Sequence, residues 1–279
     1  MSVLVAGLAG VGALGAYAAA VEPRLLLLRE PSVASRWWPA GRPALRIGIL
    51  SDLHAAWPLV TTARIERIVA RLLAARPDLV LLPGDFVSTH TRFVRGIAIE
   101  PVAHALRRLA QAAPTLAVLG NHDWYYGGER VARALERCGI RVLRNEAARV
   151  QLVGGALWIA GLDDAWTGRD DAGRALHAVD RTAPLIVLSH VPDPFASLPP
   201  EAALTVAGHT HGGQVCLPGY GPLRTATRLP RELAYGLTEM HGRHLYVSGG
   251  VGTTALPIRF ARPPEIALLT LSAPSTISA

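Results

Sequence analysis

The sequence contains no lysine, and all 28 of its basic residues are arginine. Cysteine is also scarce. The chain has two, Cys138 and Cys216, and they lie too far apart in sequence to form a Cys-x-x-Cys pair. A disulfide framework and a zinc site built from thiolates are therefore excluded. Neither a Gly-x-Ser-x-Gly elbow nor a Walker-type phosphate loop occurs, so neither of these nucleophile or nucleotide signatures is present.

Aromatic residues make up 6% of the 279 residues and charged residues 18%. The formal net charge is +7, but the arginines are scattered and are not interleaved with aromatic residues. Because a nucleic-acid groove needs a basic stripe with stacking side chains, we expect no nucleic-acid partner. Half of the residues are hydrophobic, which is enough for the core of an enzyme-sized domain and too little for a protein with many membrane spans.

The amino-terminal segment has the length and polarity of a membrane anchor. Residues 3–21 carry no charge, and a helix of this length at about 1.5 Å per residue reaches roughly the 30 Å of a bilayer core. We predict an anchor helix over residues 1–28; a cleaved signal peptide is the alternative, because small residues at 18–20 could be a cleavage site. Arginines follow the span, which favours a cytoplasmic catalytic domain over a periplasmic one.

Hydrophobic periodicity predicts an α/β body over residues 46–271. Amphipathic helices are expected at residues 65–73, 102–112 and 131–138, and buried strands at 46–50, 79–82, 116–119, 157–160, 185–188, 204–207, 245–247 and 266–271. Helices dominate the first half and strands the second, which indicates two mixed sheets packed together with helices outside. A proline-containing linker is predicted over residues 29–45 and a tail over residues 272–279.

Polar clusters follow five of the predicted strands. They contain Asp52 and His54, Asp85, Asn121 to Asp123, His190, and His209 with His211. Strand ends that lie along one edge of a sheet converge, so five clusters distant in sequence can build one site. In the Asp-x-His and His-x-His pairs, residues two apart lie on the same side of an extended segment and can reach one ion.

The ligand types in these clusters suit metal ions. Seven side chains supply carboxylate or amide oxygen and imidazole nitrogen, namely Asp52, His54, Asp85, Asn121, His190, His209 and His211. Seven ligands exceed the need of one tetrahedral zinc ion. They favour two divalent ions that share a carboxylate, with Mn, Fe or Zn as the metal. Paired ions about 3.5–4 Å apart are the arrangement that clamps the oxygens in phosphoryl displacement.

These blocks resemble the five-block pattern of the calcineurin-like metallophosphoesterases, over roughly residues 44–271. The resemblance implies a four-layer α/β/β/α sandwich with a dinuclear centre. It implies that Asp52, His54, Asp85 and His211 hold one ion, that Asp85 bridges to the other, and that Asn121, His190 and His209 complete the second site. It also implies catalytic roles for His122, beside the substrate phosphate, and for Asp123, which would orient the His122 ring. Asn121, His122 and Gln214 are the expected substrate-binding residues.

Three further motifs resemble a membrane-associated bacterial branch of this family. They are Glu22-Pro23 after the apolar helix, the stretch Gly208 to Gln214, and a carboxy-terminal pattern with Pro257-x-Arg259-Phe260 and Pro264-Glu265-Ile266. Some members of that branch are UDP-2,3-diacylglucosamine pyrophosphatases of lipid A biosynthesis, and others are phosphodiesterases of undefined substrate. The resemblance implies a metal-dependent hydrolase at the bacterial inner membrane, with membrane lipids and a phosphorylated, lipid-linked substrate as partners.

Two other functions stay open from the sequence. One is a general phosphodiesterase or phosphomonoesterase that the anchor only localises, and the other is an inactive scaffold on the same fold. Whether the enzyme acts on a lipid-linked substrate or is a general phosphoesterase, we expect water to attack phosphorus directly. His122 would stabilise the developing charge or protonate the leaving oxygen. The other histidines, His90 among them, are interpreted as surface or structural residues; for His90 the alternative is that it lines the site, because it follows Asp85 closely. Asp163-Asp164 is interpreted as a solvated loop. The oligomeric state is left open.

Overall fold

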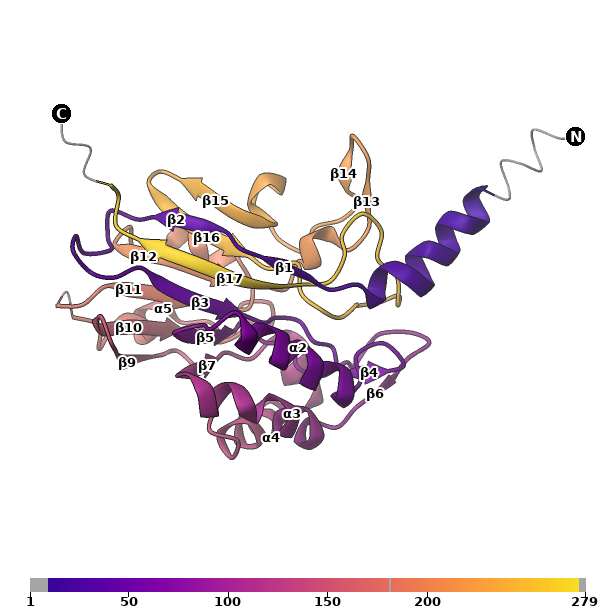
Figure 1. Ribbon diagram of the computed structural model, residues 1–279, viewed down its shortest axis with the longest axis horizontal. Helices are drawn as coiled ribbons and strands as arrows, with labels where there is room; N and C mark the ends of the chain where they lie inside the picture. The colour runs from indigo at the N-terminus through magenta and orange to yellow at the C-terminus, as the bar shows by residue number, and fades with distance from the viewer. Residues whose placement is uncertain (1–9, 181, 276–279) are drawn as a thin grey trace, which may run out of the picture.

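Two β-sheets packed face to face form the centre of the molecule (Figure 1). The computed structural model describes residues 10–180 and 182–275. The first sheet has the order β1-β17-β3-β5-β7-β8, with β2 also paired to β17. Its strands are β1 (Leu27–Arg29), β2 (Ser32–Ala34), β3 (Leu45–Ile49), β5 (Leu79–Leu82), β7 (Thr115–Ala117), β8 (Arg141–Val142) and β17 (Glu265–Ser272).

The second sheet has the order β15-β16-β12-β11-β10-β9. Its strands are β9 (Glu146–Leu152), β10 (Gly155–Gly161), β11 (Leu185–Leu188), β12 (Ala202–Ala207), β15 (Gly236–Met240) and β16 (Arg243–Val247). Two small ribbons lie outside the main sheets: β4 (Ala56–Trp57) with β6 (Arg95–Gly96), and β13 (Cys216–Leu217) with β14 (Gly221–Pro222). In both large sheets the central strands are parallel, so their carboxyl ends share one edge.

The inner faces of the two sheets build one apolar core. Ile47 and Leu81 from the first sheet belong to the same buried cluster as Ile159 and Leu204 from the second. Helices α2 (Thr62–Ala74), α3 (Ile99–Ala112) and α4 (Asn121–Glu136) pack on the outer face of the first sheet and bury a second cluster with it. The two mixed sheets with helices outside that the sequence predicts are therefore present.

Helix α2 shows why these segments are helical. Its buried apolar residues are Ile65, Ile68, Val69 and Leu72, spaced three and four apart on one face. Thr61 caps the helix, because its side chain accepts a hydrogen bond from the backbone N–H of Arg64.

The outer face of the second sheet carries little helix. It is covered by the five-residue helix α5 (Ala172–Leu176) and by the 3-10 turns η3 (Asp193–Ser197) and η5 (Arg231–Leu233). The fourth layer of the expected sandwich is thus mostly loops and short turns. Strands β9 and β15, at the two edges of this sheet, were missing from the sequence prediction because most of their residues are partly exposed or exposed and they lack a continuous apolar run.

The amino-terminal segment differs from the expected anchor and linker. Residues 10–16 are α-helical, Tyr17–Val21 continue as a π-helix, and Glu22–Arg24 form a 3-10 turn. This helix projects from the body in Figure 1. Residues 1–9 of the expected anchor lie outside the described residues, and among those described no helix has the length and apolarity needed to cross a bilayer.

Strands β1 and β2 lie where the sequence placed the end of the anchor and the linker. Both pair in parallel with β17, so residues 27–34 extend the first sheet. Their backbone groups need partners, and the free edge of β17 supplies them. Because this pairing joins segments more than 230 residues apart, the local sequence pattern carries no sign of it.

Candidate metal centre

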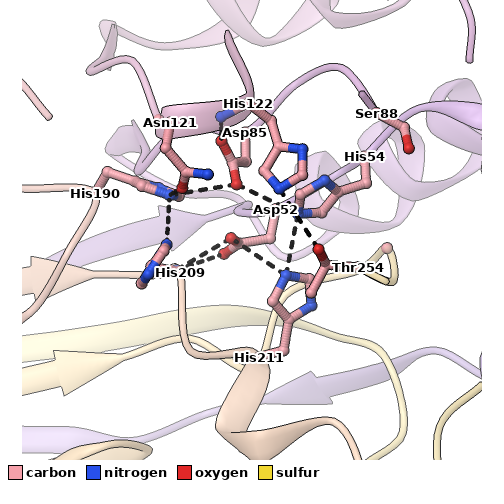
Figure 2. A network of polar contacts seen from close by, with 12 residues as sticks. Asp52, His54, Asp85, Ser88, Asn121, His122, His190, His209, His211 and Thr254 are labelled. Atoms are coloured by element: carbon pink, nitrogen blue, oxygen red, sulfur yellow. Dashed lines mark hydrogen bonds and ion pairs between the residues drawn. The ribbon is translucent and has the colours of Figure 1, made fainter. Parts of the chain in front are cut away.

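The five polar clusters meet at the carboxyl ends of the parallel strands (Figure 2). The loops after β3 and β5 supply Asp52, His54 and Asp85, and the first two residues of α4, which follows β7, are Asn121 and His122. Loops after β11 and β12 supply His190, His209 and His211. All seven side chains that the sequence proposed as metal ligands are buried and belong to one network (Figure 2).

The first group of ligand atoms lies on the side of β3. The Nε2 atoms of His54 and His211 face each other at 3.0 Å. Oδ1 of Asp52 lies 3.7 Å from Nε2 of His211, and Oδ2 of Asp85 lies 3.4 Å from Nε2 of His54. Asp52, His54 and His211 therefore bring one carboxylate oxygen and two ring nitrogens together, and Asp85 approaches this group through His54.

The second group lies on the side of β11 and shares Asp85. Nε2 of His190 is 3.3 Å from Oδ2 of Asp85, 3.2 Å from Oδ1 of Asn121 and 3.1 Å from Nδ1 of His209. The same Asp85 oxygen thus contacts both groups, as a bridging carboxylate would.

The protonation of the ligands fits a cation. Burial lowers the pKa of His54 and of His209 to about 3. In each ring the buried nitrogen without a hydrogen-bond partner, Nδ1 of His54 and Nε2 of His209, is not the one that makes the contacts described above. Neutral imidazole is the form that binds a metal. Burial also lowers the pKa of His190, but the carboxylates of Asp85, Asp52 and Asp164 together outweigh it and raise that pKa to about 10. In the absence of metal, therefore, a proton on His190 offsets part of the buried negative charge.

Glycines make room for the ligands. A Cβ on Gly120 would collide with the Asp85 carboxylate and the His190 ring, and a Cβ on Gly208 would collide with Ser51 and Asp52. Any side chain at either position would displace a ligand group.

The backbone of the ligand loops is strained. Asp52, His54, Asp85, His209 and His211 all have positive φ, between 41° and 68°. Non-glycine residues rarely adopt this region, and each costs of the order of 1–3 kcal/mol. Five such residues around one centre indicate that the surrounding fold holds the ligands in place for a function.

Asp123 does not contact the His122 ring, contrary to the expectation from the resemblance. Its carboxylate accepts hydrogen bonds from the backbone N–H groups of Asp85, Phe86, Val87 and Gly120, at 2.8 to 3.3 Å. Burial raises its pKa to about 8, and the Asp85 carboxylate adds to this. Asp123 therefore supports the loop that carries Asp85.

His122 is held by hydroxyl groups. Its Nδ1 lies 2.7 Å from Oγ1 of Thr89, and its Nε2 lies 3.5 Å from Oγ1 of Thr254. Its backbone N–H donates to Oδ1 of Asp85 at 2.9 Å. Neither threonine could be predicted from the sequence, because neither belongs to a strand-end motif.

A cavity of about 420 Å³ opens above the ligands. His122, His90, Trp166, Leu223 and Arg224 are among its lining residues, so His90 does line the site.

Gln214 also lines the cavity, but its amide is engaged by the backbone. Nε2 donates to the carbonyls of Thr254 and Leu256, and Oε1 accepts from the N–H of Thr254. Gln214 therefore holds the loop that carries Thr254 in place, and its expected contact with substrate stays a prediction.

The Asp163-Asp164 pair is not a solvated loop, which corrects the sequence interpretation. Both residues are buried. Asp163 accepts from the indole N–H of Trp124 at 2.8 Å, and Asp164 accepts from Thr167. The pair orders the turn that carries Trp166, whose ring centroid lies 4.8 Å from that of His209.

Comparisons with known proteins agree with this site. The profile described as "Calcineurin-like phosphoesterase" matches residues 45–213. The chain is 32% identical to "Uncharacterized metallophosphoesterase YkuE" of Bacillus subtilis, over 96% of this chain and 93% of that protein. It is 33% identical to "Phosphodiesterase YaeI" of Escherichia coli, over 81% of this chain and 82% of that protein. An "Uncharacterized metallophosphoesterase" of Aquifex aeolicus is 31% identical, over 92% and 96%.

Proposed function

The chain belongs to the calcineurin-like phosphoesterase family, and we propose that it uses two divalent metal ions to hydrolyse a phosphodiester or pyrophosphate bond in a lipid-linked substrate such as UDP-2,3-diacylglucosamine. The observation that carries the proposal is the pair of ligand groups that share Asp85. They lie at the floor of an open cavity with His122 on its wall.

Each ligand group would hold one ion. Asp52, His54 and His211 would bind the first ion, Asn121, His190 and His209 the second, and Asp85 both. The mixture of oxygen and imidazole donors suits Mn, Fe or Zn. When bound, such a pair supplies Lewis acidity toward phosphoryl oxygens and lowers the pKa of water.

His122 would act on the substrate directly. Burial lowers its pKa, so the ring is neutral at pH 7 and carries one N–H. Thr89 and Thr254 flank its two nitrogens and limit the rotation of the ring. A fixed N–H at the wall of the cavity can donate to a phosphoryl or leaving oxygen, where it stabilises the charge that develops as the bond breaks.

The rim of the cavity supports an amphiphilic substrate. Leu223 lines the cavity and is exposed, and Leu217 and Tyr220 are exposed on the neighbouring β13–β14 ribbon. Val215, just before this ribbon, pairs with Phe260, whose ring contacts Tyr17 of the amino-terminal helix. Exposed apolar side chains on the ribbon and on the helix thus lie near one another, as a surface that enters the lipid headgroup region requires.

Arginines accompany this apolar rim. Arg224 lines the cavity, and Arg228 and Arg231 follow it on the exposed surface. Guanidinium groups attract anionic lipid headgroups and bind phosphate in a bidentate manner. In this proposal the protein lies at the inner membrane of a bacterium with its catalytic domain on the cytoplasmic side, where the arginines after the amino-terminal helix favour it.

The test is hydrolysis of UDP-2,3-diacylglucosamine by the manganese-loaded full-length protein in detergent, beside an activated aryl phosphodiester. Release of UMP and lipid 1-phosphate is expected, with loss in His122→Ala. The matched control is His104→Ala, since His104 is exposed on α3. Turnover of the aryl diester alone would establish the second candidate, a general phosphodiesterase, which the name of the Escherichia coli relative favours. A metal-loaded protein that turns over neither would overturn the enzymatic proposal in favour of a scaffold.

A further inference from the structure

Two sequence motifs outside the metal ligands meet in the structure. The side chain of Glu22, 2% exposed, accepts hydrogen bonds from the backbone N–H groups of Ala261 and Arg262, at 3.0 and 2.6 Å. The N–H of Arg259 donates to the carbonyl of Ala18 at 2.9 Å. The end of the amino-terminal helix is thereby joined to residues 259–262 by two charge-assisted bonds and one neutral bond.

The side chain of Arg259 extends from this junction to the metal ligands. Its guanidinium is fully buried. Nη2 lies 3.2 Å from Nδ1 of His211 and donates to the carbonyls of Gly249, Gly250 and Gly252, at 2.6 to 3.2 Å. Nε donates to the carbonyl of Gly252 as well. A buried charge is costly unless its donors are satisfied, and here the backbone carbonyls of residues 249, 250, 252 and 262 accept from the guanidinium.

The loop that Arg259 holds supports two more ligands. The N–H of Gly252 donates to the carbonyl of Asp52 at 2.7 Å, and the N–H of Val251 donates to the carbonyl of Ser51. The packing leaves no free space, since a Cβ on Gly250 would come within 2.6 Å of Asp52 and one on Gly252 within 2.8 Å of His54. A shift of this loop would therefore move Asp52 and His54.

We propose that Arg259 is the positioning residue for the ligand group Asp52, His54 and His211, and that the amino-terminal segment 18–22 is the element that holds Arg259 in place. The proposal rests on the proposed function in that this group binds a divalent ion. The amino-terminal helix then has a role beyond membrane attachment, because its last turn is part of the support of the metal centre.

The chain offers a matched control for the loss of a buried arginine. Arg64 is 9% exposed and donates to the carbonyls of Leu59 and Leu25, at 2.8 and 3.1 Å. It thus also ties the amino-terminal segment to the body, but among the described residues its hydrogen bonds involve none of the seven ligands. Arg64→Gln therefore removes a buried arginine and its two bonds to backbone carbonyls, one of them to the amino-terminal segment, at a position outside the ligand set.

The experiment compares Arg259→Gln, Arg259→Lys, Glu22→Gln and Arg64→Gln in the full-length protein. Binding of Mn²⁺ to metal-free protein is measured by calorimetry, beside kcat, KM and the thermal midpoint. Loss of a group that orients a metal ligand weakens binding by about 10–100-fold, so we expect Arg259→Gln to weaken one Mn²⁺ site by about tenfold or more and to lower kcat more than KM. Arg259→Lys should bind Mn²⁺ more tightly than Arg259→Gln but less tightly than wild type. Glu22→Gln should also weaken Mn²⁺ binding and lower kcat, by a smaller factor than Arg259→Gln.

Equal Mn²⁺ binding in Arg259→Gln and wild type, or equal loss in Arg259→Gln and Arg64→Gln, would overturn the proposal. If Arg259→Gln does not fold, Arg259→Lys and Glu22→Gln decide it by the same comparison with Arg64→Gln. Metal binding is measured without substrate, so a protein inactive on every phosphoester still tests the role of Arg259.

Discussion

The carboxylate of Asp123 is bonded to the backbone of Asp85, with Oδ2 of Asp123 accepting from the Asp85 N–H at 2.8 Å. Asp85 is the residue whose Oδ2 contacts both groups of ligands. The position of this shared carboxylate therefore depends on a second carboxylate that binds no candidate ligand side chain in the described contacts. Asp123 thus holds the backbone of Asp85 in place, and Asp85 in turn contacts both ligand groups.

Replacement of Asp123 by asparagine should damage the protein through this loop. The amide NH₂ would face backbone N–H donors, and leaving such buried groups unpaired costs about 1–3 kcal/mol each. We expect a free energy of unfolding lower by about 2–4 kcal/mol together with loss of bound metal, measured by urea unfolding and metal analysis. If kcat fell while stability and metal content stayed unchanged, Asp123 would instead have a direct catalytic role.

The hydroxyl of Thr89 should matter through His122. Thr89→Val keeps the shape and removes the partner of Nδ1, so the ring loses its orientation but stays in the cavity. We expect kcat on an aryl phosphodiester to fall by about three- to thirtyfold with metal content retained, against about 100-fold or more for His122→Ala.

Thr238→Val is the control for Thr89→Val, because the Thr238 hydroxyl bonds only the carbonyl of Leu245 on the neighbouring strand in the described contacts. A variant Thr89→Val with the kinetics of Thr238→Val would contradict a role for the hydroxyl.

Removal of metal should destabilise the protein. The carboxylates of Asp52 and Asp85 are buried close to His211 and His54, respectively. A bound cation offsets the free-energy cost of burying their negative charge. A ligand present at 100 times its dissociation constant adds about 2.7 kcal/mol, which for a domain of this size raises the thermal midpoint by about 5–10 °C. Scanning fluorimetry with EDTA and with added Mn²⁺ measures the shift.

Asp85→Asn should abolish that metal-dependent shift, whereas His104→Ala should keep it in full. A wild-type midpoint that does not respond to EDTA or to Mn²⁺ would count against the metal centre itself.

Substitutions in the apolar β13–β14 ribbon beside the cavity should lower the turnover of lipid substrates and leave that of water-soluble substrates nearly unchanged. Leu217 and Tyr220 are 44% and 60% exposed and do not line the cavity. With both changed to serine, we expect kcat/KM on a vesicle-embedded substrate to fall by about tenfold or more, because each such side chain contributes about 1.5–3 kcal/mol when it enters an apolar phase. Turnover of a water-soluble aryl diester should stay within about twofold by the same estimate.

Val153→Ser is the matched control for the ribbon, since Val153 is fully exposed at the β9–β10 turn. Equal turnover of the vesicle substrate by wild type and by the ribbon variant would remove the ribbon from the lipid-binding surface.

Local patterns in the sequence predict many of the helices and strands of this fold. The run Leu79–Leu82 is a strand in both prediction and structure, because a continuous apolar run flanked by Pro77 and Pro83 leaves little alternative. The apolar spacing of α2 determines its helix in the same way. The edge strands β9 and β15 pair with β10 and β16, which follow them directly in the chain, but most of their residues are partly or fully exposed, so no apolar run marks them in the sequence. The outer cover of the second sheet could not be predicted either, since its short turns pack on strands from other parts of the chain.

The sequence by itself determined the candidate ligands, since each is a residue of suitable chemistry directly after an apolar run, and both features are local. Only the tertiary structure decided what supports them. Asp123 reaches a loop 38 residues away, and Arg259 contacts His211 across 48 residues. Glu22 reaches Arg262 across 240 residues. Hydrogen bonds between groups this distant in sequence form only when the sheets pack, because packing excludes water and leaves each buried polar group to find its partner within the fold.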